Sequence, residues 1–584
     1  MIKKVFKQML LTQIVSSMTV TLCMLIDSIM IGRFLGVDSM SAYGFATPLL
    51  LVFAALGSMI SAGVQVLCGK AAGCGDRNAA DACYTVSVFL AGVISAAGLV
   101  LVFAALGPLT TLLGAGRPGP GNAVYKLTRD YITGFIIGAP AFLCAQIMVP
   151  YMQISGSRMR LVVAVIAMTV SDIVFDLLNV FVFHGGTFGM GLASTLSYYI
   201  AVFIGLGYFL RPGCMFRLRR KLIRRSTCRE LISCGVPTVI NQVSLVLLVF
   251  LLNRLLRSAA GNVAVAAYSV ISTVGNICYC FGAGVGSVAM MLSAIFYTDD
   301  DRTSIRELVR VMTKNTVVLN AAVTLVVLLA ATPLVALFLG DSPEAKRLAV
   351  VGLRLFVLSM VPSGLNTAFK SYYQGVNRLH LTELISVLQN FAMPALFAAV
   401  LSSFWGATGV WLCYVCGETA ALLILSGIVW RKNGRVSLSA EAYELLDPSF
   451  GAAPEDCLER KIQSVQDAAE VSEAAVRFCS EHELEPRLAR LIGLCIEEMA
   501  VNVVLHGFGR DKKPHNVDVR LVIKENSRVI RIRDNCFNFD PVSYLKLHET
   551  DDPTAHVGIR MVMKMVKQAN YVNTLGLNNL TLVL

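Results

Sequence analysis

Long apolar stretches, separated by short polar segments, fill the first three quarters of the chain. Each is about as long as a helix that crosses a bilayer, for which about 20 apolar residues suffice. They fall at Met9–Ile31, Gly44–Leu67, Ala82–Leu106, Tyr131–Gln153, Leu161–His184 and Gly189–Leu210, and then at Ile232–Leu256, Val263–Phe296, Thr313–Leu339, Val350–Tyr373, Leu381–Phe404 and Ala407–Trp430. The pattern predicts an α-helical polytopic membrane protein with about twelve transmembrane helices in two six-helix bundles, residues 1–215 and 216–432.

The two sets of six stretches look like a repeat. Gly36 precedes Tyr43 by seven residues, as Gly261 precedes Tyr268. The stretch YMQISGSRMRL, which starts at Tyr151, is echoed by YYQGVNRLHL at the corresponding place in the second set. Two homologous bundles that face each other are typical of transporters, with the substrate site between the halves.

The character of the chain changes after Arg431, where the long apolar stretches end. Residues 433–460 are polar and contain Pro448 and Pro454, which predicts a linker. Beyond it, the apolar spacing predicts helices over Ile462–Glu481, Pro486–Val504 and Ile559–Gln568, and strands over Val517–Ile523, around Ile530 and Ile532, and over Asn579–Leu584. Residues 461–584 are therefore expected to form a small α+β domain.

Positive charge is concentrated in some of the connecting segments and nearly absent from others. The 584-residue chain has a formal net charge of +12, although only 15% of its residues are charged. The segment Arg211–Arg229 is densely cationic, and Lys70, Arg158 and Arg378 fall on the same side of the membrane by parity. Because cationic loops stay in the cytoplasm, we expect a multi-pass protein of the bacterial inner membrane with both termini cytoplasmic. Cationic loops beside the lipid bilayer account for the positive net charge of the chain. We therefore expect no nucleic acid as a partner.

Three carboxylates interrupt the apolar stretches of the first bundle. Asp27 lies in the first stretch, and Asp172 and Asp176 lie four residues apart in the fifth, on one helix face. Acids inside a membrane usually face a polar cavity or a partner, although Asp27 is close enough to its helix end to face water instead. Paired carboxylates in a low-dielectric site resist being charged together, so they can hold a proton, and the same oxygens can coordinate Na⁺. Either ion would couple its entry to a conformational change.

The first 432 residues resemble the multidrug and toxic compound extrusion family, the MATE transporters. The resemblance is carried by IDSIMIGRFLGVDSMSAYGFATPL, by YMQISGSRMRL and by SDIVFDLLNVFVFHGGTFGMGLASTLS. It implies an antiporter for xenobiotic efflux, which exchanges organic, usually cationic compounds for H⁺ or Na⁺.

By this resemblance, the ion-coupling residues would be Asp27, Asp172 and Asp176 with a hydroxyl from Ser194 or Thr195. The chain departs from the family at Asp172, where many relatives have asparagine, and this leaves the coupling ion open between H⁺ and Na⁺. The seventh stretch has no mid-span acid, and its polar candidates are Asn241 and Gln242, for which helix packing is an alternative role.

The motif IEEMAVNVVLHGF lies in the second predicted helix of the C-terminal domain. Glu498, Asn502 and His506 are four residues apart and share one helix face. An acid and an amide one turn apart suit a base that polarises water and a ligand for Mg²⁺.

This motif and the segments IRIRDNCFNFDP, HVGIRMV and NNLTLVL resemble the ATP-binding domain of the gyrase and histidine-kinase superfamily, especially the anti-sigma-factor serine kinases. The resemblance implies Glu498 as a catalytic general base, Asn502 as the Mg²⁺ ligand, Asp534 as the acceptor for the adenine amino group, and Gly558 in the segment that covers the nucleotide. The family's Asp-x-Gly-x-Gly becomes Asp534-Asn535-Cys536-Phe537-Asn538, without either glycine. Because such glycines let the backbone approach the nucleotide, a degenerate, protein-binding domain is the alternative.

The sequence favours a secondary active exporter of a small organic compound, with a cytoplasmic regulatory domain that resembles an ATP-binding domain. No Walker-type G-x-x-x-x-G-K-[ST] motif occurs, so we do not expect ATP to drive transport. One alternative is a flippase for lipid-linked precursors, which would favour basic residues in the central cavity. The other is a membrane-tethered anti-sigma-type serine kinase with a transporter-like sensor, which would act on an anti-anti-sigma-like regulatory protein.

Overall fold

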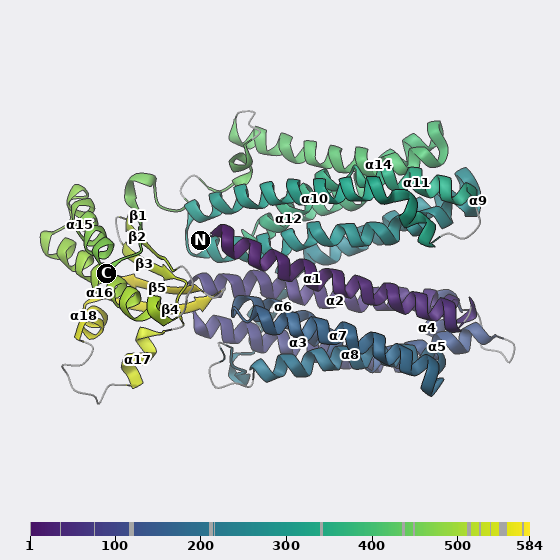
Figure 1. Ribbon diagram of the computed structural model, residues 1–584, viewed down its shortest axis with the longest axis horizontal. Coiled ribbons are helices and arrows are strands. Elements are labelled where there is room, and N and C mark those ends of the chain that lie inside the picture. The colour runs from purple at the N-terminus through teal and green to yellow at the C-terminus, as the bar shows by residue number, and fades with distance from the viewer. Residues whose placement is uncertain are drawn as a thin grey trace.

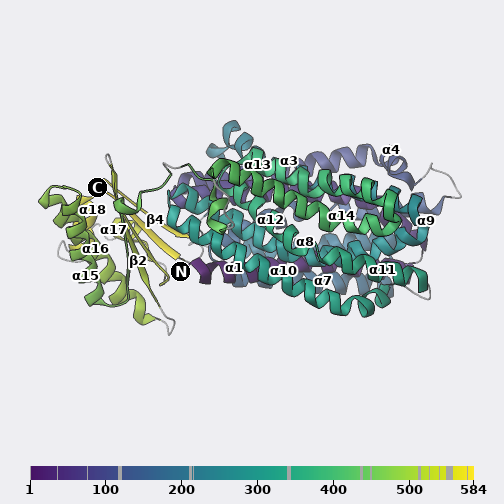
Figure 2. The ribbon, with the colours of Figure 1, turned by 90° about the horizontal axis from the view of Figure 1, so that it is seen from above.

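The structure is a computed structural model that describes residues 2–35, 37–74, 76–115, 122–209, 214, 216–338, 343–434, 439–447, 450–510, 515–524, 527–537, 539–547, 557–574 and 577–584. Two helical bundles lie side by side, and a small domain with a sheet lies at one end of them (Figure 1). Both ends of the chain lie at this end, which we call the domain end (Figure 1). The opposite end of the bundles is called the far end, and the domain extends the molecule along its long axis (Figure 2).

Each bundle is built from one half of the membrane-spanning part of the chain. The first contains α1 (Ile2–Met30), α2 (Val37–Cys74), α3 (Arg77–Ala104), α4 (Leu106–Thr110), α5 (Ala123–Ile136), α6 (Ala139–Ile154), α7 (Arg158–Leu178) and α8 (Gly186–Phe209). The second contains α9 (Arg225–Thr298), α10 (Arg302–Phe338), α11 (Pro343–Val357), α12 (Met360–Gly375), α13 (Leu379–Val387) and α14 (Met393–Asn433).

The described helices provide twelve spans, the number that the sequence predicts. Nine helices are long and apolar enough to cross a membrane, and two bent pairs, α5 with α6 and α11 with α12, form one span each. The last of the nine, Leu379–Asn433, has 55 residues, which would be about 80 Å if straight. It turns back at Gly406, where φ is 56°, so that Gly417 lies against Pro394, and it therefore makes two spans.

The continuous helix α9 also contains two spans, Arg225–Leu256 and Ala267–Thr298. Cys234 and Met290, one from each span, pack in the same small cluster, so the helix must double back between them.

The C-terminal domain has one antiparallel sheet with the strand order β1-β2-β3-β5-β4. Its elements are β1 (Cys457–Ile462), α15 (Val465–Glu481), α16 (Pro486–Gly507), β2 (Val517–Lys524), β3 (Ser527–Asp534), α17 (Pro541–Leu547), α18 (Val557–Met565), β4 (Gln568–Thr574) and β5 (Leu577–Val583). The helices α15 and α16 and the three predicted strands appear where the sequence places them, within a few residues. The sequence analysis missed β1, α17 and β4, and it extended the last helix into β4.

The apolar side chains of β2 and β3 face the helices of the domain. Val519 and Leu521 of β2 and Ile530 and Ile532 of β3 pack in one core with residues of α15, α16 and α18. Because side chains alternate along a strand, the residues between them face the other way. That second face of the sheet lies against the domain end of the bundles (Figure 1).

Residues 439–447 of the segment predicted as a linker pack on the second bundle, whereas its last residues belong to β1. The hydroxyls of Tyr372 and Tyr373 donate to the carbonyl oxygens of Glu444 and Tyr443, each at 2.9 Å. Arg306 Nε donates to Glu444 Oε1 at 2.9 Å. This part of the segment is therefore fixed to the second bundle, while Pro448 lies outside the described residues.

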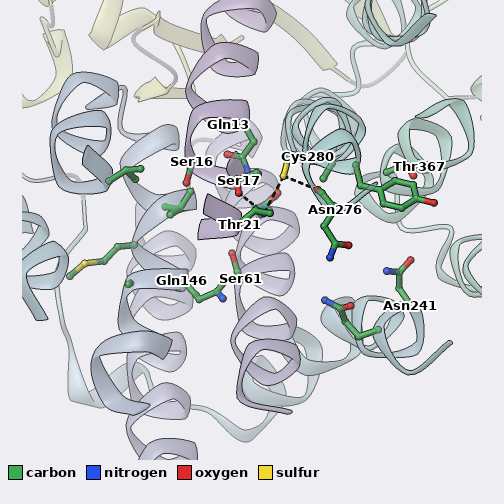
Figure 3. Close-up of a pocket in the computed structure, with 18 of the residues that line it drawn as sticks. Gln13, Ser16, Ser17, Thr21, Ser61, Gln146, Asn241, Asn276, Cys280 and Thr367 are labelled. Atoms are coloured by element: carbon green, nitrogen blue, oxygen red, sulfur yellow. Dashed lines mark hydrogen bonds between the residues drawn. The ribbon is translucent and has the colours of Figure 1, made fainter. Parts of the chain in front are cut away.

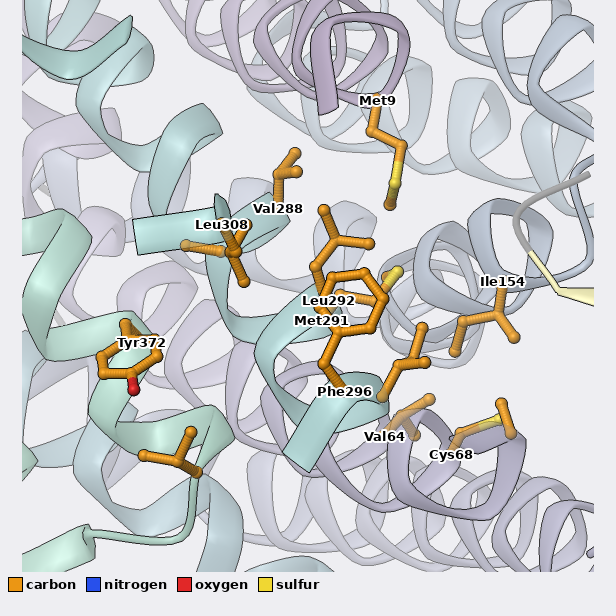
Figure 4. Close-up of a cluster of buried hydrophobic side chains, with 14 of the residues drawn as sticks. Met9, Val64, Cys68, Ile154, Val288, Met291, Leu292, Phe296, Leu308 and Tyr372 are labelled. Atoms are coloured by element: carbon orange, nitrogen blue, oxygen red, sulfur yellow. The ribbon is translucent and has the colours of Figure 1, made fainter. Parts of the chain in front are cut away.

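A large hydrophobic cluster joins the two bundles at the domain end (Figure 4). It contains Val64 and Cys68 from the first bundle and Val288 and Met291 from the second, and Leu577 of β5 packs against it. At the far end, the buried apolar side chains form two separate clusters, one in each bundle. Among the described residues, buried apolar side chains thus pack the bundles together at the domain end, and neither far-end cluster is shared between them.

Candidate functional site

A cavity of about 500 Å³ lies between the two bundles. Gln13 and Thr21 of α1 and Ser61 of α2 line it from one side, and Asn241 and Asn276 of α9 line it from the other (Figure 3). Amides and hydroxyls make up most of its polar lining. Cavities of about 300–1,000 Å³ suit drug-sized molecules, so this is the candidate substrate site.

The three carboxylates singled out in the sequence come together inside the first bundle. Asp27 is 7% exposed, Asp172 is 2% exposed and Asp176 is fully buried. The three carboxyls interact electrostatically with one another. Because buried carboxylates that repel one another resist being charged together, this arrangement can hold a proton or a cation.

The hydroxyl candidates lie in different places. Ser194 Oγ donates to Asp27 Oδ2 at 3.1 Å, which puts it in the acidic cluster. Thr195 Oγ1 instead lies 2.9–3.3 Å from the carbonyl oxygens of Gly134, Phe135 and Gly191. Thr195 therefore joins α8 to α5 and does not contribute its hydroxyl to the acids.

The acidic cluster adjoins the cavity. Tyr198 lines the cavity and interacts electrostatically with Asp172. Helix α1 contributes Thr21 to the cavity and, about one and a half turns later, Asp27 to the cluster. Several cluster oxygens have no hydrogen-bond partner among the described residues: Asp27 Oδ1, Asp172 Oδ1, and both carboxylate oxygens of Asp176.

A second buried polar network lies in the other bundle, and the sequence analysis missed it. Lys370 Nζ donates to Asn241 Oδ1 and, at 3.2 Å, to Gln389 Oε1. Gln389 Nε2 lies 3.4 Å from Glu418 Oε1, and Asn366 Nδ2 donates to Glu418 Oε2 at 2.9 Å. Lys370 and Glu418 could have been singled out from the sequence in the same way as Asp27. Each is a charged residue inside a predicted membrane span, and such residues usually face a polar cavity or a partner.

The C-terminal domain has a pocket of about 350 Å³ beside α16 and the end of β3. Asn502, His506 and Asp534 line it, together with Asn578 of β5. Asp534 Oδ1 accepts hydrogen bonds from Asn578 Nδ2 at 2.7 Å and from the Cys536 backbone N–H at 2.9 Å. Burial raises the pKa of the Asp534 carboxyl, and these hydrogen bonds act in the opposite direction.

Glu498 and Gly558 lie next to each other where α16 meets α18. A side chain in place of Gly558 would overlap the Glu498 carboxylate, which would have to move aside. Asn502 Nδ2 donates to the Glu498 carbonyl at 2.7 Å, which leaves its amide oxygen for a cation. Cys536 and the exposed Phe537 line the pocket in the segment where the Asp-x-Gly-x-Gly motif would place glycine. Asn538 of the same segment lies outside the described residues.

Charged side chains join the outer face of the sheet to the second bundle at the turn between α9 and α10. Asp301 Oδ1 lies 2.7 Å from Arg520 Nη1, and Asp301 Oδ2 lies 2.6 Å from Arg531 Nη2. Asp299 pairs with Arg531 and, at 3.1 Å, with Arg533. Although burial alone would raise the pKa of Asp301, these guanidinium groups hold it well below its usual range.

The first bundle makes a separate contact with the domain. Arg77, at the start of α3, pairs with Asp540 at 2.7 Å. Asp540 directly precedes α17, whose residues Pro541 and Tyr544 line the pocket of the domain. The domain therefore contacts both bundles, and the contact with the first bundle lies beside the pocket.

Comparison with known proteins identifies the membrane-spanning part. Residues 13–178 and 237–400 match the family model MatE, and together they are more than half of the chain. The chain belongs to the MatE family. The predicted family and the polytopic, two-bundle fold class are thereby confirmed, since each matched segment falls in one of the two bundles.

Several curated MatE relatives are similar over most of their length. The chain is 22% identical to "Multidrug export protein MepA" of Staphylococcus saprophyticus over 423 residues, 71% of this chain and 90% of that protein. It is 25% identical to "Probable multidrug resistance protein NorM" of Bradyrhizobium diazoefficiens over 421 residues, 68% of this chain and 87% of that protein. A solved outward-facing MATE transporter of the MOP superfamily shares the fold with a TM-score of 0.70 at 19% identity, over 76% of this chain and 97% of that one.

Residues 463–584 match the family model for the histidine kinase-like ATPase domain. The predicted class of the C-terminal domain is therefore confirmed, and we call it the ATPase-like domain. The segments that match the two family models together cover about three quarters of the chain.

Proposed function

We propose that this MatE protein is a secondary active exporter that moves organic compounds out of a bacterial cell in exchange for H⁺. The cluster of Asp27, Asp172 and Asp176 carries the proposal, because buried carboxyls that repel one another resist being charged together and so need a proton or a cation. The unpartnered oxygens of the cluster are acceptors that an entering ion would satisfy. The exporter function is also supported by the names of the relatives, a multidrug export protein and a probable multidrug resistance protein.

The two ends of the bundles suggest an orientation. The cationic segments are expected in the cytoplasm, and they connect helices at the domain end. The ATPase-like domain and both termini would then be cytoplasmic. Because the shared hydrophobic cluster closes the domain end, we propose that the cavity is reached from outside in this conformation.

The proposal predicts gradient-driven transport without ATP. Proteoliposomes that contain the full chain should move an organic dye against its own gradient when a pH gradient is imposed. The reason is that proton entry through the acidic cluster supplies the free energy. Dye fluorescence measures the movement; a response to a Na⁺ gradient alone would assign Na⁺ as the coupling ion, and a requirement for ATP hydrolysis without any gradient would contradict the proposal.

We further propose that the ATPase-like domain binds nucleotide with Mg²⁺ and regulates transport. Its pocket brings together Asn502 and Asp534, and Glu498 lies on the same helix face as Asn502. Contacts with both bundles give the domain a route by which nucleotide would bias their relative position. Regulation fits this arrangement better than energy supply, because no phosphate-cradling loop of the pump type occurs in the sequence.

Replacing Asp534 by asparagine should weaken nucleotide binding. The carboxylate is a charged acceptor, whose loss costs about 1.5–3 kcal/mol, so the affinity should fall about tenfold or more. Binding of a fluorescent ATP analogue with Mg²⁺ to the full chain measures the change. Glu473→Gln on the exposed face of α15 is the matched control. Unchanged binding in Asp534→Asn would remove Asp534 from the site, whereas gradient-driven transport should persist in either variant.

The membrane-tethered regulator is the second candidate, and the fixed contact between domain and bundles favours it. In that case the bundles would sense a compound, and the domain would transfer phosphate to a serine of an anti-anti-sigma-like protein. A chain truncated after Lys432 that transports as fast as the full chain, with a full chain that phosphorylates such a protein, would favour this candidate over the exporter with a regulatory domain.

A further inference from the structure

The cavity between the bundles has an unusual charge for a protein expected to carry organic cations. Among the described residues that line it, Lys370 is the one charged side chain, and none of the lining residues is acidic. The acidic cluster of the first bundle lies behind Tyr198 and does not line the cavity. The charged group nearest to a compound in the cavity is therefore the Lys370 ammonium.

We propose that the cavity binds an organic anion, whose carboxylate or phosphate group pairs with Lys370. This inference deepens the proposed function and rests on it for the direction of movement, but not for binding itself. It names the substrate class that the cavity favours in place of a cation.

The surroundings of Lys370 hold its ammonium group without neutralising it. Lys370 is 9% exposed, and the partners of its ammonium group are the neutral amide oxygens of Asn241 and Gln389. Among the described residues no carboxylate forms an ion pair with it, although Glu418 attracts it electrostatically from behind Gln389. An ammonium group has three donors, and buried charges are favourable only when they are paired, so the site is built to accept an anion.

Glu418 does not remove this positive charge from the cavity. It lies behind Gln389, is 4% exposed and does not line the cavity. Its carboxylate accepts hydrogen bonds from Asn366 and Gln389. Gln389 thus bridges the two charges, with its oxygen toward Lys370 and its nitrogen toward Glu418, and fixes the lysine at the cavity surface.

The rest of the lining points to a hydroxyl- or amine-bearing anion. Gln65, which is 6% exposed, lines the cavity, and its Oε1 has no hydrogen-bond partner among the described residues. This acceptor suits a ligand N–H or O–H. Asn276, Gln146 and Thr367 add further hydrogen-bonding groups around the same space (Figure 3).

Dye binding to the full chain in detergent tests the proposal without relying on transport. Carboxyfluorescein, a polyanion, should bind at least about tenfold more tightly than the cation ethidium, as measured by fluorescence polarisation. Lys370→Gln should weaken carboxyfluorescein binding by about tenfold or more and leave ethidium binding unchanged, whereas Lys370→Arg should retain it. Lys314→Gln, on an exposed position of α10, is the matched control.

Loss of folding is separated from loss of the charge by the choice of variants. Glutamine in place of Lys370 still donates to Asn241, and a melting curve checks that the variant is folded. Tighter binding of ethidium than of carboxyfluorescein to the wild type, or unchanged carboxyfluorescein binding in folded Lys370→Gln, overturns the proposal. Gradient-driven ethidium transport with either result would leave the proposed exporter function intact.

Competition identifies the source of the anion. Displacement of carboxyfluorescein by glucose 6-phosphate but not by a polyprenyl phosphate assigns a soluble anionic compound. Displacement by the polyprenyl phosphate alone assigns a lipid headgroup. If a simple dicarboxylate displaces the dye and neither phosphate does, the charged group is a carboxylate. Each of these results supports an anion at Lys370, and displacement by none of the anions contradicts it.

Discussion

Proteoliposomes that contain Asp176→Asn should move dye no faster than empty liposomes when a pH gradient is imposed. Asp176 is fully buried, interacts with Asp27 and has no hydrogen-bond donor among the described residues. Asparagine keeps the size of the side chain but cannot take up a proton, so the cluster loses the coupling step. The initial rate of dye movement under a fixed gradient measures the effect.

A second acid of the same bundle provides the control for this experiment. Asp38→Asn changes an exposed acid at the start of α2 and should leave the rate unchanged. Dye binding without a gradient should also survive in Asp176→Asn, because Asp176 does not line the cavity. Transport by Asp176→Asn at the wild-type rate would show that the acidic cluster is structural.

Replacing Asp301 by alanine should release the ATPase-like domain from the second bundle. The Asp301 carboxylate is fully buried and contacts both Arg520 and Arg531, so its removal leaves two buried cations without that partner. Breaking a buried ion pair from one side typically costs about 3–5 kcal/mol. Hydrogen exchange of the β2 and β3 amides in the full chain should therefore become faster in the variant.

The geometry of the sheet makes this effect larger than for an ordinary ion pair. Arg520 and Arg531 stand directly opposite each other on β2 and β3, where like charges destabilise a sheet. Asp301 lies between them and compensates both. Asp300→Asn is the control, because Asp300 is half exposed and contacts Lys524 instead. Unchanged exchange in Asp301→Ala would mean that apolar contacts alone hold the domain in place.

The ion pairs of Asp301 with Arg520 and Arg531 should persist in mild acid. The pKa of Asp301 in the folded protein lies below its unfolded value of about 3.9, so its contribution is fully present above about pH 4. It is lost only as the pH falls toward the depressed folded value. The protection factors of the β2 and β3 amides, which correct the exchange rate for its base-catalysed intrinsic value, should accordingly be the same at pH 7 and pH 5.

The membrane spans and the acids inside them could be predicted from the sequence, whereas the partners of individual side chains could not. The twelve spans and the acids inside them were predictable, because apolar length and buried charge are properties of the sequence itself. The separation of Ser194 from Thr195 was not, since neighbouring residues of a helix face different elements and only packing decides which one meets Asp27. Lys370 and Glu418 also interrupt apolar stretches, but only the charged residues inside the first bundle were singled out as candidates.

The docking of the ATPase-like domain was harder to foresee, although a signal exists. Arg531 and Arg533 alternate with apolar residues on β3, which normally indicates a face in water. The partner acids, Asp299 to Asp301, lie in a connecting segment on the side where cations are expected. An acidic turn on that side, together with an arginine-rich sheet face, indicates a contact that neither feature indicates alone.

The chain order of this contact has a consequence for biosynthesis. The acidic turn at Asp299–Asp301 leaves the ribosome long before the arginines of the sheet, at about 5–20 residues per second. During that interval the two bundles enter the membrane with an uncompensated acidic surface. Only a chain that is translated through Arg533 covers this surface, so the ATPase-like domain docks after both bundles have been made.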